Sequence, residues 1–550
     1  MNYQIFAWYH SQNQLGKKRY LWEYFWISLL FIAALLLLCL NLGNLPLRDW
    51  DEAIVAQVAK EISVAENPWH AWLHPTLWGE KYFNKPPLVH GLIALLYNWT
   101  GEINEFNSRF PSALLTAISV PFVYLIGREI FVLPLPALFS GLIYLTLLPV
   151  VRHGRLAMLE GALLCFSVVF FWAILRSRRN LRWSLGVGLA LSLICLTKGL
   201  MMGVLLVIIA GIFLAWDTPR LLVSVYFWLG IILGSLPLLA WYYLQYTYYG
   251  QDFITVNLGS QSLARIKTAV EGNSGSLLYY LWELIKYSFP WLIFSLGGWQ
   301  LAWQNKVWGW SKLILVWSGI YFLAISLMAT KLPWYLLLIY PPLALAGGIQ
   351  LATVVNITNQ KKYPVIWQYI FVILTILPIT AAIYLFFGLK NWDLVTIMTL
   401  TALSLSMLMT TILLHRRDNQ FIPVLFWGMY VALLLFVSSP HWNWELNEYY
   451  PVKPVANLIK TEVPSDAQIY INFPWERPSL NFYSQRRVIT VPETEQLQKI
   501  WQTQSDAAEL YVLITTEAKT SAKLPGAKTI DTVALPGFVD WLLIKKEPNE

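Results

Sequence analysis

Residues 22–43 read WEYFWISLLFIAALLLLCLNLG, an apolar run long enough to cross a bilayer as a helix. The stretch RDWDEAIVAQVAKEI follows at residues 48–62 and contains the acidic pair Asp51–Glu52 near its start. Because no small-residue cleavage site follows the apolar run, we expect an uncleaved first span. The acidic pair is then expected at a membrane surface, directly after the first crossing.

The composition is that of a polytopic membrane protein. Of 550 residues, 57% are hydrophobic and only 13% are charged, more apolar surface than a soluble domain can bury. The net charge is +8, yet residues 441–550 hold 11 Lys/Arg against 14 Asp/Glu. The positive excess therefore lies in the membrane part, where it is a topology signal, and we expect no nucleic-acid partner.

Apolar runs of spanning length predict about thirteen transmembrane helices. They fall near residues 22–43, 109–127, 131–150, 158–175, 183–198, 199–216, 220–243, 278–302, 313–329, 334–355, 365–388, 393–414 and 421–439. The run 88–99 is shorter, which favours an interfacial or re-entrant helix. Counting it as a span would move the cluster Arg176, Arg178, Arg179 and Arg182 outside, against the positive-inside rule.

This count predicts an inner (plasma) membrane protein with a cytoplasmic N-terminus and an extracytoplasmic C-terminus. We expect a transmembrane domain over residues 1–440, whose outer loop 44–108 carries interfacial helices, and a second domain over 441–550. In the second domain, β-like runs alternate with helical ones, which predicts a compact α/β fold. The β-like runs are AQIYINF, RRVITV, LYVLIT and VDWLLIKK, and the helical runs are VANLIKTEV and ETEQLQKIWQ.

The segment after Asp51 has an apolar stripe at helical spacing, with Gln57, Lys60 and Glu61 on the opposite face. We expect an amphipathic helix along the membrane surface, with Asp51 as its N-cap. Functionally, Asp51 or Glu52 is suited to act as a general base that takes a proton from an attacking hydroxyl. The alternative is that both are capping and surface residues.

The segment FNKPPLVHGL, at residues 83–92, places Lys85 before two prolines that fix the local backbone. A compact ammonium suits a lipid phosphate whose negative charge grows as a sugar leaves. The alternative is an interfacial lysine that extends its amine toward water.

Further polar groups are expected on the outer face near span ends. Arg109, Lys198 and Lys331 would form a cationic rim for an anionic donor, with Tyr335 in the same turn as Lys331. Individually, each can also be an interface anchor.

Glu160 differs from these groups because it lies just inside a span, where an unpaired carboxylate is costly. We expect it to pair with Arg152, Arg155 or a substrate.

Several motifs resemble the polyprenyl-phosphate-dependent glycosyltransferases of the GT-C superfamily, in the branch of aminoarabinose lipid A transferases and protein O-mannosyltransferases. The motifs are DEAIVAQVAKEI, YFNKPPLVHGLIAL, NSRFPSALL, GRLAMLEGALL, LTKG, YSFPWLIF and KLPWYLLLIYPPLAL, in the order of that family. The resemblance implies a GT-C fold with Asp51 as the catalytic or acceptor-orienting carboxylate. It also implies that Lys85 and Tyr82 face the donor phosphate and that Glu160 is a second acidic residue.

Three departures from that family bear on zinc binding and on specificity for lipid A. The aminoarabinose transferases place a glutamate, used as a metal ligand, where this chain has Asn84, and they carry an arginine where it has Ile54. Loop 244–277 contains no histidine, although those transferases supply a histidine ligand there. We therefore assign no metal ligands and expect no tightly bound zinc. A bound divalent metal is the alternative.

The sequence favours an inverting membrane glycosyltransferase. It would move one sugar from a polyprenyl monophosphate donor to a lipid, glycan or protein acceptor. A flippase or transporter of lipid-linked sugars is the first alternative, and it predicts internal repeats and broken helices. A non-catalytic lipid-binding membrane protein is the second.

Overall fold

The computed structural model describes residues 16–355, 363–388, 393–443, 452–503, 509–522, 524–534 and 539–546. The chain divides into two compact units. The membrane unit comprises Met1–Leu42, Phe83–Val89 and Arg109–Trp442, and the tail unit comprises Gly43–Tyr82, His90–Ser108 and Asn443–Glu550. The expected domains meet at residue 440, close to the observed boundary after Trp442, but most of loop 44–108 groups with the tail.

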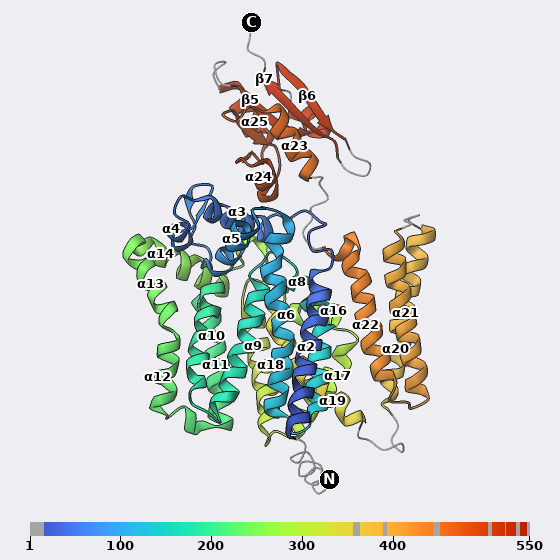
Figure 1. Ribbon diagram of the computed structural model, residues 1–550. Coiled ribbons are helices and arrows are strands. Elements are labelled where there is room, and N and C mark those ends of the chain that lie inside the picture. Colours follow the sequence, from blue (N-terminus) through green and yellow to red (C-terminus); the bar gives the residue numbers. More distant parts are fainter. Residues whose placement is uncertain are drawn as a thin grey trace. The chain divides into compact units, whose positions relative to one another are not determined.

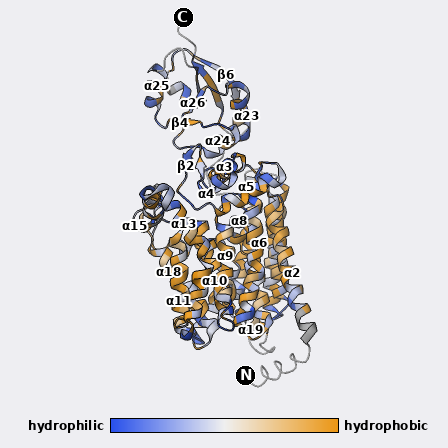
Figure 2. Cartoon of the chain, turned by 60° about the vertical axis from the view of Figure 1, so that its left-hand side comes forward, coloured by the Kyte–Doolittle hydropathy of each residue, from blue (hydrophilic) through white to orange (hydrophobic). Residues whose placement is uncertain are grey.

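The membrane unit is a bundle of apolar helices (Figures 1 and 2). Among the described residues, nine helical segments are long and apolar enough to cross a membrane. They are α2 (Gly16–Cys39, apolar from Leu21), α6 (Glu105–Ile130), α9 (Glu160–Ser177), α11 (Leu200–Asp217), α18 (Gly309–Leu327), η5–α19 (Pro333–Val355), α20–η6 (Val365–Gly388), α21 (Leu394–His415) and α22 (Phe421–Ser438).

Two bent pairs raise the count to eleven if each pair is one span. These are α7 (Pro134–Leu145) with α8 (Leu148–Gly154), bent by 56°, and α12 (Val225–Gly234) with α13 (Leu236–Tyr249), bent by 51°. The other two predicted spans correspond to shorter helices. One is α10 (Trp183–Lys198), and the other is broken into α16 (Tyr279–Tyr287) and α17 (Trp291–Gln304). All thirteen predicted segments contain helices. Only nine of them are long and apolar enough to count as spans, or eleven with the two bent pairs.

Small residues allow the central helix α19 (Tyr340–Val355) to approach its neighbours α7 and α17 closely. A Cβ atom on Gly298 of α17 would lie 1.8 Å from the Ala346 carbonyl oxygen, and one on Gly348 would lie 2.5 Å from the Pro136 carbonyl oxygen. Only glycine fits at these contacts. Close backbone approach through small residues is typical of helix packing within membranes.

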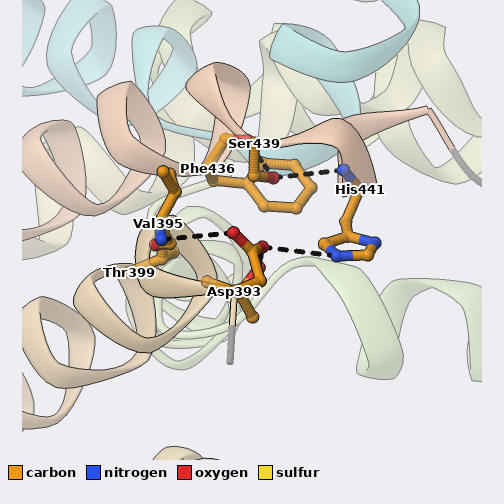
Figure 3. A network of polar contacts seen from close by, with 7 residues as sticks. Asp393, Val395, Thr399, Phe436, Ser439 and His441 are labelled. Atoms are coloured by element: carbon orange, nitrogen blue, oxygen red, sulfur yellow. Dashed lines mark hydrogen bonds and ion pairs between the residues drawn. The ribbon is translucent and has the colours of Figure 1, made fainter. Parts of the chain in front are cut away.

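A polar network joins the start of α21 to the end of α22 (Figure 3). Asp393 caps α21 by accepting from the Val395 backbone N–H at 3.3 Å, and its other oxygen lies 3.4 Å from His441 Nε2. His441 belongs to η7 (Pro440–Trp442), and its backbone N–H donates to Ser439 Oγ at 3.2 Å. These bonds satisfy helix-end groups that would otherwise lack partners.

The C-terminal part of the tail unit is an α/β fold built on a five-stranded sheet of order β4-β3-β5-β7-β6. Strand β3 pairs in parallel with β4 and β5, whereas β7 pairs antiparallel with β5 and β6. The elements are α23 (Val452–Glu462), β3 (Gln468–Ile471), α24 (Pro478–Ser484), β4 (Ile489–Thr490), α25 (Thr494–Thr503), β5 (Leu510–Thr515), α26 (Thr516–Ala522), β6 (Ala527–Val533) and β7 (Trp541–Lys546). The predicted α/β fold is confirmed, and β6, α24 and α26 are additions to it.

The N-terminal part of the tail unit holds α3 (Asp51–Val64), α4 (Pro68–Leu73), the hairpin β1 (Thr76–Leu77) and β2 (Glu80–Lys81), and α5 (Leu88–Thr100) from His90 onward. Helix α3 forms where predicted, but two details of that prediction are wrong. Its N-cap is Trp50, not Asp51, which is the first helical residue. Gln57 is buried on the expected polar face, so burial extends beyond the apolar stripe.

Candidate functional site

Asp51 and Glu52 lie side by side in sequence but in different surroundings. Glu52 is fully buried, and its Oε2 accepts from the Arg48 backbone N–H at 3.0 Å, which closes the turn before α3. Asp51 is half-buried, at the helix start. Of the two carboxylates, Asp51 is therefore the one placed to meet another molecule.

Tyr82 lies in the same unit as Asp51 and is buried, with its ring edge-on to that of His90 at 5.6 Å between centroids. Burial, and after it the negative charge of Asp51, raise the pKa of Tyr82 well above its usual range. The phenol stays protonated at neutral pH, so it is a neutral hydrogen-bond donor close to the Asp51 carboxylate.

Lys85 belongs to a cationic cluster in the membrane unit. Its Nζ donates to Gln261 Oε1 at 3.2 Å, and Arg265 Nη2 donates to the same oxygen at 3.4 Å. Arg265 Nη1 in turn donates to the Tyr335 hydroxyl at 3.3 Å. Two cations and a phenol thus converge, and Arg265 Nε is buried with no hydrogen-bond partner among the described residues. An unsatisfied buried donor of this kind is typical of a site completed by a ligand or water.

The segment that supplies these partners is η3 (Thr255–Leu263), followed by α15 (Ala264–Lys267). It holds the segment beside Lys85, because Asn257 Nδ2 donates to the Phe83 backbone carbonyl oxygen at 3.2 Å and Gln261 Nε2 donates to the Asn84 side-chain oxygen Oδ1 at 3.4 Å. Gln261 and Arg265 were not among the site residues predicted from the sequence. A signal was present in the sequence, since the thirteen-span count places loop 244–277 outside, and the basic residues Arg265 and Lys267 in it run against the positive-inside rule.

Glu160 and Lys198 form an ion pair between the start of α9 and the end of α10. The expectation that Glu160 pairs with Arg152 or Arg155 is therefore replaced by Lys198, which the sequence analysis had placed on the cationic rim. Together with Tyr335, the pair lines a small cavity with room for about one water molecule. Because the Tyr335 hydroxyl also accepts from Arg265 Nη1, the cavity and the cationic cluster adjoin at this residue.

Arg109 and Lys331 are buried cations that bond backbone carbonyl oxygens near helix ends. Arg109 is fully buried, donates to the Leu42 carbonyl oxygen at 3.0 Å and lies 5.3 Å from the Trp442 ring. Lys331 is buried, and its Nζ donates to the carbonyl oxygens of Ile325 and Ser326 at the end of α18. Cations that satisfy helix-end carbonyls stabilise those ends. We therefore leave both residues out of the proposed donor site.

Arg155 is a third buried cation with such a role. Its guanidinium donates to the carbonyl oxygens of Leu37, Leu38 and Leu40 at the end of α2, and it lies 4.4 Å from the Trp442 ring. These contacts account for its position without Glu160.

The described residues offer no assembled metal site, since no group of three or more His, Cys, Asp or Glu side chains lies close enough to hold an ion. Asn84, where the resemblance implies a carboxylate ligand, instead accepts a hydrogen bond from Gln261. The residues present do not fit a bound divalent metal of the kind the resemblance implies, and we derive no step through one.

Of the predicted site residues, the membrane unit brings together Lys85, Tyr335, Lys198 and Glu160. Asp51, Glu52 and Tyr82 belong to the tail unit.

Comparison with known proteins supports the resemblance seen in the motifs. Residues 28–252 match the family described as dolichyl-phosphate-mannose-protein mannosyltransferase. An undecaprenyl phosphate-alpha-4-amino-4-deoxy-L-arabinose arabinosyl transferase of Pseudomonas fluorescens is 28% identical over 329 residues, which are 58% of this chain and 59% of that protein. The Pseudomonas aeruginosa protein of the same name is 27% identical over 340 residues, 60% of this chain and 61% of its own. The chain thus matches about three fifths of the length of these relatives.

Solved structures show the fold. ArnT from Cupriavidus metallidurans, bound to undecaprenyl phosphate, superposes with a TM-score of 0.73 at 17% identity, over 95% of this chain and 98% of that one. The archaeal oligosaccharyltransferase AglB from Archaeoglobus fulgidus, in complex with an inhibitory peptide and a dolichol-phosphate, superposes with a TM-score of 0.55 at 12% identity, over 95% and 74%. The predicted GT-C fold and the resemblance to aminoarabinose transferases are confirmed. With the apolar helices, these findings support a multi-pass protein of the inner membrane.

Proposed function

We propose that this chain is a membrane glycosyltransferase that transfers a single sugar from a polyprenyl-phosphate donor to a lipid, glycan or protein acceptor. The observation that carries the proposal is the convergence of Lys85 and Arg265 on one oxygen, with the Tyr335 hydroxyl beside them. The relatives that match about 60% of the chain act, by their names, on an undecaprenyl-phosphate-linked sugar, and the family match covers residues 28–252.

The donor phosphate is assigned to the cationic cluster. Lys85 offers a compact ammonium and Arg265 a planar fork, two forms of charge that together suit several phosphate oxygens. As the bond between the anomeric carbon and the phosphate oxygen breaks, negative charge grows on the phosphate, and fixed cations stabilise it. The lipid chain would stay in the bilayer, beside the apolar helices of the membrane unit.

Asp51 is assigned the role of general base. It would take the proton of an acceptor hydroxyl while the hydroxyl oxygen bonds to the anomeric carbon and the polyprenyl phosphate leaves from the opposite face. A single displacement of this kind inverts the anomeric configuration. Tyr82, a neutral donor near Asp51, would orient the carboxylate without removing its charge. An acceptor that is already an ionised phosphate would need no base.

The reaction is placed on the outer face of the inner membrane, with the N-terminus cytoplasmic and the tail unit extracytoplasmic. The positive-inside distribution of Arg176, Arg178 and Arg179 supports this orientation. Residues 1–15 lie outside the described part of the chain.

Mass spectrometry of cell-envelope glycolipids and glycoproteins, with and without the protein, tests the proposal directly. The expected result is one sugar mass that is missing from one acceptor class in cells lacking the protein and restored by the wild-type chain. Unchanged envelope sugars under conditions of full expression would count against a transferase.

A flippase for lipid-linked sugars is the second candidate, and the bends at α7–α8 and α12–α13 favour it, because broken helices are a feature of transporters. The two functions differ in product. In sealed liposomes a flippase would move a fluorescent polyprenyl-phosphate sugar across the bilayer without consuming it, whereas a transferase supplied with an envelope extract as acceptor source would release polyprenyl phosphate.

A further inference from the structure

The backbone between Asp49 and Asp51 makes an unusual turn directly before α3. Trp50 has φ 55° and ψ −76°, and the Asp51 backbone N–H donates to the Asp49 carbonyl oxygen at 2.7 Å. These values describe a γ-turn of the rare form with positive φ, which is strained for a residue with a side chain. Such a conformation persists only where the surrounding contacts hold it, and it occurs most often at functional sites.

The contacts that hold this turn come from the C-terminal part of the tail unit. The Asp49 carboxylate is only 1% exposed, and its Oδ2 lies 2.6 Å from Nε of Arg477, which is 2% exposed. Its Oδ1 accepts from the Ser479 backbone N–H at 2.7 Å. Both carboxylate oxygens are therefore bound by a segment that lies more than 400 residues further along the chain.

Arg477 is itself fixed. It precedes Pro478, the first residue of α24, and its guanidinium lies 4.9 Å from the Phe473 ring. A buried charge pair is retained with its geometry because the loss of either partner leaves a costly unpaired charge. The ion pair with Arg477 therefore fixes the position of the Asp49 carboxylate.

The flanks of the turn are tied down as well. The Leu47 backbone N–H donates to the Tyr483 hydroxyl at 2.7 Å, and that hydroxyl lies 2.7 Å from Glu105 Oε1. On the other flank, the Ala53 backbone N–H donates to the Arg48 carbonyl oxygen at 2.9 Å. Helix α24 also packs on α3. Little freedom is left for the residue that follows the turn.

We infer that Arg477 is a positioning residue, which sets the direction of the Asp51 carboxylate by holding Asp49 and the strained turn between them. This inference rests on the proposed role of Asp51 as general base. The C-terminal part of the tail unit then acts on the proposed base from within the unit that contains Asp51. Displacement of a catalytic group by about 1 Å can lower turnover by about 10²-fold. A turn that is held in place therefore keeps turnover high.

The test compares Arg477→Gln and Arg477→Lys with the matched control Arg487→Gln. Arg487 forms an exposed ion pair with Glu80 in the same unit, 2.8 Å apart, so its loss removes an equal charge without touching the turn. Three quantities are measured on the full-length chain: hydrogen exchange of the peptide covering residues 47–53, binding of undecaprenyl phosphate, and turnover. Turnover is the release of undecaprenyl phosphate when lipid-linked sugars extracted from the source cells are mixed with an envelope extract of the same cells, which supplies the acceptor.

For Arg477→Gln we expect exchange at residues 47–53 to become at least tenfold faster and turnover to fall about 10–100-fold. Binding of undecaprenyl phosphate should stay at the wild-type level, since the cationic cluster is intact. Arg477→Lys should recover part of the turnover, and Arg487→Gln should change none of the three. Wild-type turnover in a folded Arg477→Gln variant, or unchanged exchange at residues 47–53, overturns the inference.

Trp50→Gly and Trp50→Ala provide a second measurement if the Arg477 variants fail to fold. Glycine adopts positive φ without strain, so Trp50→Gly should keep more turnover and exchange more slowly than Trp50→Ala. Equal values for both variants would contradict a strained turn. If the wild-type chain releases no undecaprenyl phosphate, the proposed function fails. The exchange rates then decide alone whether Arg477 holds the turn.

Discussion

Lys85 and Arg265 share one hydrogen-bond acceptor, because Gln261 Oε1 lies 3.2 Å from Lys85 Nζ and 3.4 Å from Arg265 Nη2. Two side chains from segments about 180 residues apart are thus brought to one point within the membrane unit. Like charges at close range repel, so the arrangement is favourable when an anion binds between or beside them. This relationship makes the cluster, rather than the wider cationic rim, the proposed donor-phosphate site.

Removal of the Lys85 charge should weaken donor binding and turnover together. The charge contact with the phosphate exists before the transition state and strengthens in it, so we expect Lys85→Ala to lower turnover about 10²–10³-fold. Undecaprenyl phosphate binding, measured by native mass spectrometry, should weaken in parallel. Lys85→Arg should recover only part, since a planar fork does not reproduce an ammonium before two prolines. Unchanged binding in Lys85→Ala would remove Lys85 from the site.

Arg265→Ala should have an effect of the same kind, although the sequence analysis did not single this residue out. Lys267→Ala is the matched control, because Lys267 is an exposed cation two residues away on the same short helix. We expect Arg265→Ala to weaken undecaprenyl phosphate binding and Lys267→Ala to leave it unchanged. Equal effects of the two would indicate general surface charge instead of a defined site.

Much of the fold could be predicted from the sequence because its helices and strands follow from local hydrophobic patterns. Apolar runs marked the helices, and period-two runs such as LYVLIT marked β5, since both signals depend only on neighbouring residues. Strand β6 was not predicted because AKTIDTV is exposed at most positions and has little apolar pattern. Span counting was limited by breaks that hydropathy does not detect, such as the one between α16 and α17.

The site was harder to predict because its decisive contacts are distant in sequence. The Glu160–Lys198 pair and the bonds of Arg265 and Asp49 depend on which helices meet, and no local pattern encodes that. Charge alone marked Arg109 and Lys331 as donor residues, whereas burial against helix-end carbonyls gives them another role. The roles of Asp51 and Lys85 stay predictions, and they rest on motifs that are contiguous in the sequence.

Asp51→Asn should separate chemistry from folding. We expect preserved folding and undecaprenyl phosphate binding, with turnover lowered by ~10²–10⁴-fold, as is typical when a general base is lost. Glu52→Gln is the matched comparison, because Glu52 is buried and bonds the Arg48 backbone. It should lower the thermal midpoint first and turnover only through the fraction of folded protein. Near-normal turnover in Asp51→Asn would exclude Asp51 as the base.

Membrane orientation can be checked by cysteine labelling in a variant lacking the three native cysteines. Exposed positions are needed, so we select Lys267 and Arg487 for the outer face and Arg179 and Arg416 for the cytoplasmic face. A membrane-impermeant maleimide should label the first two in intact cells and the second two only after the cells are opened. Labelling at position 179 from outside would reverse the orientation and place the Glu160 end of α9 in the cytoplasm.

Variants of the Glu160–Lys198 ion pair can show whether Glu160 belongs to a structural charge pair or acts as a catalytic acid. Glu160 is 3% exposed and Lys198 14%, and breaking a buried pair by removing one partner costs about 3–5 kcal/mol. Glu160→Gln alone should therefore lower the free energy of unfolding substantially, and the double variant Glu160→Gln with Lys198→Met should recover much of that loss. If the pair is structural, turnover per folded molecule in the double variant should approach that of the wild type. A folded double variant with turnover still lowered by about 10²-fold or more would instead assign Glu160 a part in the chemistry.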